Sequence, residues 1–142
     1  MILHTVRPFL FTLIVLWSIN AFSQKDGLSF LALGDSYTVG TSELPQHSWP
    51  EQFVQLIAKK GILLNPPTIL AGEGWTTDKL LSEIESATLE SEYDLVSLLI
   101  GVNNQYRDLD NYQFKDQFNK LLQKSISLAG NDTSRVFVLS IP

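Results

Sequence analysis

The feature that most constrains the fold is an almost purely apolar run, Leu95–Ile100, which ends in Gly101. A strand that is apolar at nearly every position, rather than at every second one, is typical of a parallel sheet covered by helices on both faces. Three more short apolar runs fit the same pattern, at Leu28–Leu33, Thr68–Ala71 and Val136–Ile141. The sequence therefore predicts four buried strands.

The segments between these runs have the apolar spacing of helices. Helices are expected from Ser48 to Gly61, from Thr76 or Thr77 onward, and from an Asn111 cap to Gly130. Ser48 and Glu51 have the spacing of a capping box, and residues 103–110 read as a polar loop. Strands that alternate with helices predict right-handed crossovers and a three-layer α/β fold with a parallel sheet in the middle.

Residues 1–23 have the pattern of a secretory signal peptide. An apolar stretch, Pro8–Trp17, is followed by small residues at Ala21 and Ser23, which predict cleavage after Ser23. The apolar stretch is shorter than the roughly 20 residues that span a bilayer, so a retained membrane anchor is the less favoured alternative. The sequence thus predicts a mature domain at residues 24–142 that is secreted or periplasmic.

Composition narrows the class of partner. The length of 142 residues and a hydrophobic content of 44% indicate one globular domain, and the absence of cysteine excludes disulfides and thiolate metal sites. Loss of Arg7 with the signal leaves 9 of the 10 basic residues against 15 acidic ones, a net charge of −6. Because an acidic surface attracts neither nucleic acid nor an anionic membrane, the charge balance argues against both as partners and leaves uncharged or weakly charged substrates open.

Three loops follow the first three strands at their carboxyl ends, where open parallel sheets bind ligands. These loops contain Ser36, Gly74 and Asn103. A serine hydroxyl after a buried strand could act as a nucleophile, whereas a glycine N–H and an asparagine amide are donors of the kind that stabilise an oxyanion. Each residue also has an ordinary alternative role in a turn or helix cap. Their order and placement together favour a hydrolytic site.

The same loops resemble the sequence blocks of the SGNH/GDSL hydrolases. Gly34–Tyr37 resembles the first block, Gly74 falls at the glycine of the second, and Gly101–Asn104 resembles the third. The resemblance implies a flavodoxin-like fold and a serine ester hydrolase that uses no cofactor and acts on a small-molecule ester. It also implies Ser36 as nucleophile, with an oxyanion hole made by the Ser36 N–H, the Gly74 N–H and the Asn103 side chain.

Two departures from the family pattern bear on activity. Asn104 stands where the third block usually has aspartate, although the oxyanion donor is retained, so we expect loss of Asn104 to matter much less than loss of Asn103. The Asp-x-x-His pattern that supplies the family's acid and base is absent from residues 1–142. We expect both residues to follow Pro142, the sequence to be an N-terminal portion, and this portion to be inactive by itself.

Two other classes of function stay open at this point. One is a non-catalytic secreted binding domain with the same fold. The weaker one is a phosphate or nucleotide site at Gly34–Gly40, which lacks both a Walker lysine and a GxGxxG run. His47 lies in a polar loop, where a histidine is usually solvated rather than catalytic. The composition does not indicate a metal site.

Overall fold

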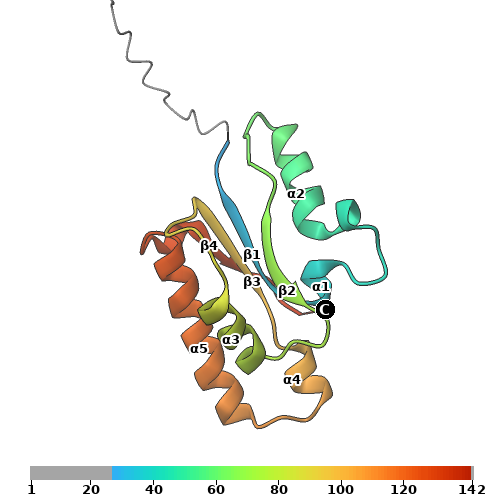
Figure 1. The fold of residues 1–142 in the computed structure, drawn as a ribbon, viewed down its shortest axis with the longest axis vertical. Helices are drawn as coiled ribbons and strands as arrows, with labels where there is room; N and C mark the ends of the chain where they lie inside the picture. The colour runs from blue at the N-terminus through green and yellow to red at the C-terminus, as the bar shows by residue number, and fades with distance from the viewer. Residues whose placement is uncertain (1–26, 142) are drawn as a thin grey trace, which may run out of the picture.

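Four parallel strands form the centre of the molecule (Figure 1). The computed structural model describes residues 27–141, and the predicted signal sequence with its cleavage site lies outside them. In chain order the strands are β1 (Phe30–Asp35), β2 (Thr68–Gly72), β3 (Leu95–Leu99) and β4 (Val136–Val138). Their spatial order is β2-β1-β3-β4, which is the order of flavodoxin-like sheets up to the fourth strand.

The four predicted strands are all present, but their ends differ from expectation. β1 continues two residues past the apolar run, because its last residue, Asp35, still pairs with Gly72 of β2. β4 ends at Val138 rather than Ile141, since among residues 27–141 it pairs on one side only, with β3. A strand at the edge of a sheet has fewer ladder hydrogen bonds to hold its end.

Helices α3 (Thr77–Ser86) and α5 (Asn111–Leu128) cover one face of the sheet (Figure 1). Alternate residues of the two central strands point to this face, because side chains alternate along a strand. The fully buried leucine and valine residues of this layer are Leu31, Leu33, Leu80, Val96, Leu98 and Leu121. Burial of one such side chain stabilises the fold by roughly 1.5–3 kcal/mol. This layer therefore fixes β1 and β3 at the centre of the sheet.

Helix α2 (Trp49–Ala58) covers the opposite face with aromatic side chains. The ring centroid of Phe30 in β1 lies 6.1 Å from that of Trp49, 5.5 Å from that of Phe53 and 6.2 Å from that of Phe137. Aromatic rings at these distances attract one another in tilted and offset arrangements. Helices on both faces of the sheet confirm the predicted three-layer, flavodoxin-like α/β fold.

Two of the predicted helix caps are wrong. Ser48 precedes α2, but its side chain makes no capping hydrogen bond. Pro50 has no N–H at the second helical position, and the N–H of Glu51, the donor in a capping box, makes no bond to the Ser48 hydroxyl either. Asp110, and not Asn111, caps α5, since its carboxylate accepts a hydrogen bond from the Gln113 N–H at 2.7 Å.

Short helices occupy segments whose sequence pattern does not reveal them. Helix α1 (Ser36–Val39) follows β1 directly, and α4 (Val102–Tyr106) lies mostly within the expected polar loop of residues 103–110. Two 3-10 turns, η1 (Pro45–His47) and η2 (Thr133–Arg135), complete the elements. Helices this short contain too few residues to show an apolar period. No helix within residues 27–141 is both long and apolar enough to cross a bilayer.

Candidate active site

The carboxyl ends of β1, β2 and β3 lie together at one edge of the sheet. In the parallel register, Asp35 at the end of β1 pairs with Gly72 of β2, and Gly34 pairs with Leu99 of β3. The loops after these three strands therefore start side by side. Because β2 and β3 flank β1 on opposite sides, the edge includes the point where the strand order reverses. Ligands of open α/β sheets bind at such a point.

Ser36 is the first residue of α1, immediately after the buried end of β1. Asp35 caps this helix, and its carboxylate accepts a hydrogen bond from the Tyr37 N–H at 3.0 Å. Gly34 permits the close approach of β3, because a Cβ at this position would lie 2.6 Å from the Leu99 carbonyl oxygen. Ser36, at this sharp strand-to-helix turn, is half-buried at the sheet edge.

The carboxyl group of Asp35 is buried, and burial raises its pKa above the ordinary value. The hydrogen bond from the Tyr37 N–H opposes this effect and lowers the pKa. Within the described part of the chain, no group bonds to the second carboxyl oxygen, Oδ2. An ionised Asp35 therefore carries a desolvation cost that its surroundings only partly offset.

Residues 72–75 form a tight turn closed by a hydrogen bond from the Trp75 N–H to the Gly72 carbonyl oxygen at 3.3 Å. Gly74, the third residue of the turn, has a φ of 71°, which favours glycine because a side chain is strained there. A Cβ on Gly72 would overlap the Trp75 ring. The sequence Gly-Glu-Gly-Trp thus dictates the turn that places the Gly74 backbone at the carboxyl edge.

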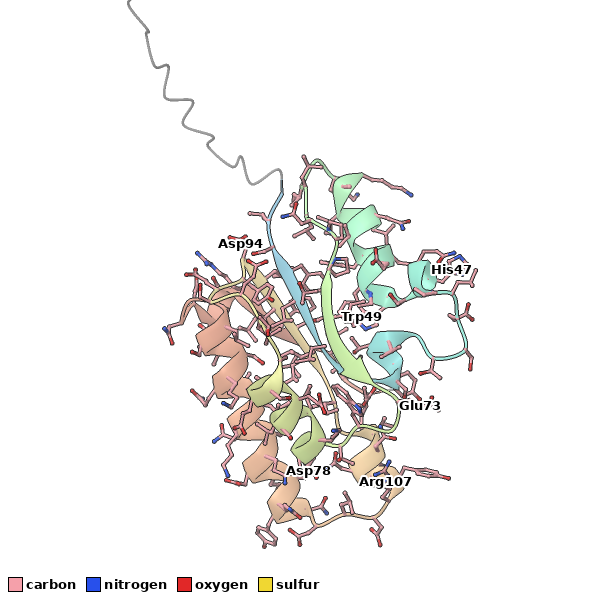
Figure 2. The ribbon with its side chains drawn as sticks, viewed as in Figure 1. His47, Trp49, Glu73, Asp78, Asp94 and Arg107 are labelled. Atoms are coloured by element: carbon pink, nitrogen blue, oxygen red, sulfur yellow. The ribbon has the colours of Figure 1, made fainter. Side chains whose placement is uncertain are left out.

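Helix α4 and the residue that caps its C-terminus, Arg107, contact this turn through two side chains. Asn103 Nδ2 donates to the Trp75 carbonyl oxygen at 2.9 Å, and Arg107 Nη2 donates to the Gly74 carbonyl oxygen at 2.8 Å. Figure 2 shows Arg107 reaching from α4 toward the loop that carries Glu73. An asparagine amide nitrogen has two hydrogens. The bond to Trp75 uses one of these hydrogens and fixes the plane of the Asn103 amide.

Asn104 is the site residue whose part in the structure the sequence pattern misses. Its side chain is nearly inaccessible, with the residue 4% exposed. Asn104 Oδ1 accepts from the Thr77 N–H at 3.1 Å, and Asn104 Nδ2 donates to the Thr77 hydroxyl at 2.8 Å. The Thr77 hydroxyl in turn donates to Gln117 Oε1 of α5 at 2.5 Å. A polar side chain so soon after an apolar strand is the sequence signal that could have pointed to such a network.

His47 occupies an exposed turn. It is the last residue of η1, and its Nδ1 lies 3.7 Å from the Glu43 carboxylate. Figure 2 shows it on the outer flank of the molecule, beside the start of α2. None of the contacts described for residues 27–141 joins its ring to Ser36. Within the same residues, no group of three His, Asp or Glu side chains could hold a metal ion.

The sequence pattern of one protein family, described as the GDSL-like Lipase/Acylhydrolase family, matches residues 32–141. The matched region includes the loops of Ser36, Gly74 and Asn103. The chain belongs to this family. The family resemblance predicted from the three sequence blocks is thereby confirmed. No curated protein sequence matches the chain.

Several solved structures share the fold of this GDSL-like family member. TesA superposes with a TM-score of 0.68 at 20% identity over 80% of this chain, and AlinE4, an SGNH-hydrolase family esterase, with 0.68 at 18% over 82%. The psychrotrophic esterase EstA from Pseudoalteromonas sp. gives a TM-score of 0.65 at 15% identity over 81%. Identities this low show a common fold alone. The chain spans 60% of the length of TesA and AlinE4 and 62% of EstA.

Proposed function

We propose that the complete protein is a secreted or periplasmic serine ester hydrolase in which Ser36 is the nucleophile. The observation that carries the proposal is the parallel register, which starts the loops of Ser36, Gly74 and Asn103 at one edge of the sheet. Membership of the GDSL-like lipase/acylhydrolase family supports the same chemistry.

In the proposed reaction, the Ser36 oxygen attacks the carbonyl carbon of a small-molecule ester. The carbonyl oxygen becomes an oxyanion that accepts hydrogen bonds from the Ser36 N–H, the Gly74 N–H and the Asn103 amide. Collapse of the tetrahedral intermediate breaks the bond to the alcohol, which leaves with the proton taken from Ser36. Water then adds to the acyl-enzyme, releases the carboxylic acid and returns the proton to Ser36. No cofactor takes part in these steps.

A serine hydroxyl needs a base to become an effective nucleophile near neutral pH. We propose that a histidine oriented by an aspartate, both following Pro142, fills this role. Two facts support the proposal: residues 1–142 contain no Asp-x-x-His sequence, and the chain spans 60% of the length of TesA. We also propose that residues 1–23 are a signal peptide and that residues 24–142 belong to the exported domain.

A non-catalytic binding domain is the second candidate function. The missing Asp-x-x-His sequence is the observation that favours it. A protein of this kind would retain affinity for an ester through the same three loops without hydrolysing it.

The deciding experiment compares variants of the full-length protein on a short activated ester. We expect Ser36→Ala to abolish hydrolysis and Asn103→Ala to lower kcat by about 10²–10³-fold with little change in KM, as for loss of one oxyanion donor. Asn119→Ala, at an exposed position of α5 where alanine is a good helix former, is the matched control and should leave both constants unchanged. Ester binding without turnover in the unaltered protein would favour the binding domain instead.

A further inference from the structure

We propose that helix α4 acts as a clamp on the segment 74–77, and that Arg107 and Asn104 are positioning residues for the oxyanion hole. The inference rests on the proposed function, because it assigns a role to residues that hold the Gly74 N–H and the Asn103 amide. Neither Arg107 nor Asn104 would touch the substrate in this role. Each would act through the backbone that it binds.

The first half of the clamp holds two consecutive carbonyl groups. Arg107 Nη2 bonds to the Gly74 carbonyl oxygen at 2.8 Å, and Asn103 Nδ2 bonds to the Trp75 carbonyl oxygen at 2.9 Å. Positions 103 and 107 are four residues apart, so they lie on the same side of α4. The peptide planes on the C-terminal side of Gly74 are therefore held by one helix, and their orientation restricts the direction of the Gly74 N–H.

The second half of the clamp is buried and holds the start of α3. The Thr77 N–H requires an acceptor, which Asn104 Oδ1 supplies. The Thr77 hydroxyl gives its single hydrogen to Gln117, so its oxygen requires a donor, which Asn104 Nδ2 supplies. An amide meets both needs at once, whereas a carboxylate offers acceptors only. The asparagine that replaces the family's usual aspartate therefore matches the bonding pattern of Thr77 and Gln117.

The clamp matters because oxyanion stabilisation depends on donors that are already in position before the reaction. A displacement of about 1 Å in a catalytic group can cost roughly 10²-fold in rate. Without side chains from α4, the turn at residues 72–75 would be held by its own hydrogen bond from Trp75 to Gly72. Four hydrogen bonds between residues 103, 104 and 107 and residues 74, 75 and 77 restrict that freedom.

The test uses the full-length protein and separates kcat from KM. We expect Arg107→Met and Asn104→Ala each to lower kcat by about 10-fold, the scale of one lost bond to a charged or buried group. KM should change by less than about twofold, because the ground-state ester does not depend on the oxyanion donors. Arg107→Lys should recover most of kcat, since a lysine ammonium can still donate to the Gly74 carbonyl oxygen. Asn104→Asp should recover less, because its carboxylate can accept from the Thr77 N–H but cannot donate to the Thr77 hydroxyl. Arg135→Met is the matched control, because Arg135 pairs with Glu92 instead.

Hydrogen exchange at the Trp75 and Thr77 amides, which are both hydrogen-bonded, supplies a readout that does not need turnover. We expect faster exchange at Thr77 in Asn104→Ala and at Trp75, whose N–H closes the turn, in Arg107→Met, with unaltered circular dichroism in both. Unchanged exchange rates together with unchanged kcat would overturn the clamp while Ser36→Ala still abolished hydrolysis. Hydrolysis that survives Ser36→Ala would instead overturn the proposed function, and the exchange rates would still decide whether α4 holds the loop.

Discussion

At Asp35, two effects shift the pKa of the carboxyl group in opposite directions: burial raises the pKa, and the capping hydrogen bond lowers it. Its carboxylate accepts the Tyr37 N–H, which stabilises the first turn after β1. Its burial raises the pKa above 3.8, which means that the folded state holds the proton more tightly than the unfolded state. The contribution of protonated Asp35 to the stability of the fold is therefore fully present below the pKa of the unfolded state. It is lost as the pH rises through the pKa of the folded state.

From this sign we predict that Asp35→Asn raises the free energy of unfolding at pH 7, because asparagine retains the cap but cannot ionise. The difference from the unaltered protein should shrink as the pH falls below 4. Urea unfolding at pH 7 and pH 3 measures both values. Asp132→Asn is the matched opposite case: bonds from Ser134 lower the Asp132 pKa, so its contribution is present at pH 7 and is lost on acidification. If the free energy of unfolding changed with pH in the same way in both variants, the opposite pKa shifts assigned to Asp35 and Asp132 would be wrong.

The positions of Ser36, Gly74 and Asn103 could be predicted because each follows an apolar run after a fixed short interval. The bonds of Asn104 and Arg107 could not, since their partners lie 27 and 33 residues away in the chain. Such contacts depend on how β2 and β3 are placed around β1. The placement of these three loops was thus predictable from the sequence, whereas the contacts that hold them required the fold.

At the scale of elements, the apolar runs predicted all four strands, and the helical spacing predicted α2, α3 and α5. The errors fall at element ends, where one local bond decides the boundary. The Ser48 side chain forms no bond to the first turn of α2, and Asp110 rather than Asn111 caps α5. Helix α4 is too short to have a detectable period, so it was expected to be a loop.

The cap of α5 gives a prediction at this scale. Asp110→Ala removes the acceptor of the Gln113 N–H and should lower the free energy of unfolding by about 1 kcal/mol. Asp116→Ala, on the exposed side of the same helix, removes only an ion pair with Lys120 and should cost a few tenths of a kcal/mol, about the worth of such a pair. Urea unfolding of both variants measures which of them loses more free energy of unfolding. If Asp116→Ala cost more than Asp110→Ala, the assignment of the cap would be wrong.

The whole molecule presents an edge at β4, which pairs with β3 and with no other strand in the described part of the chain. We predict that residues 24–142, expressed alone, show no Ser36-dependent hydrolysis, whereas the full-length protein does. The reason is chemical, because loss of the base leaves serine hydrolases with only about 10³–10⁴-fold acceleration over water.

A fair comparison first requires that both forms are folded, since an unpaired strand edge promotes association. Circular dichroism and size-exclusion chromatography establish this before the ester is added. Ordinary enzymic turnover by folded residues 24–142, lost on Ser36→Ala, would reveal a base within them, and His47→Ala would then be the next variant to measure.

The strand order also has a consequence for how the chain is made. β1 lies between β2 and β3, and the residues that precede β1 and β3, Ser29 and Asp94, are hydrogen-bonded although they are 65 residues apart. At synthesis rates of about 5–20 residues per second, the third strand emerges roughly 3–13 s after the first. Throughout that interval Leu31 and Leu33 cannot be packed against Val96 and Leu98 of β3, so the rate of translation between β1 and β3 sets the shortest time for which these apolar side chains stay uncovered.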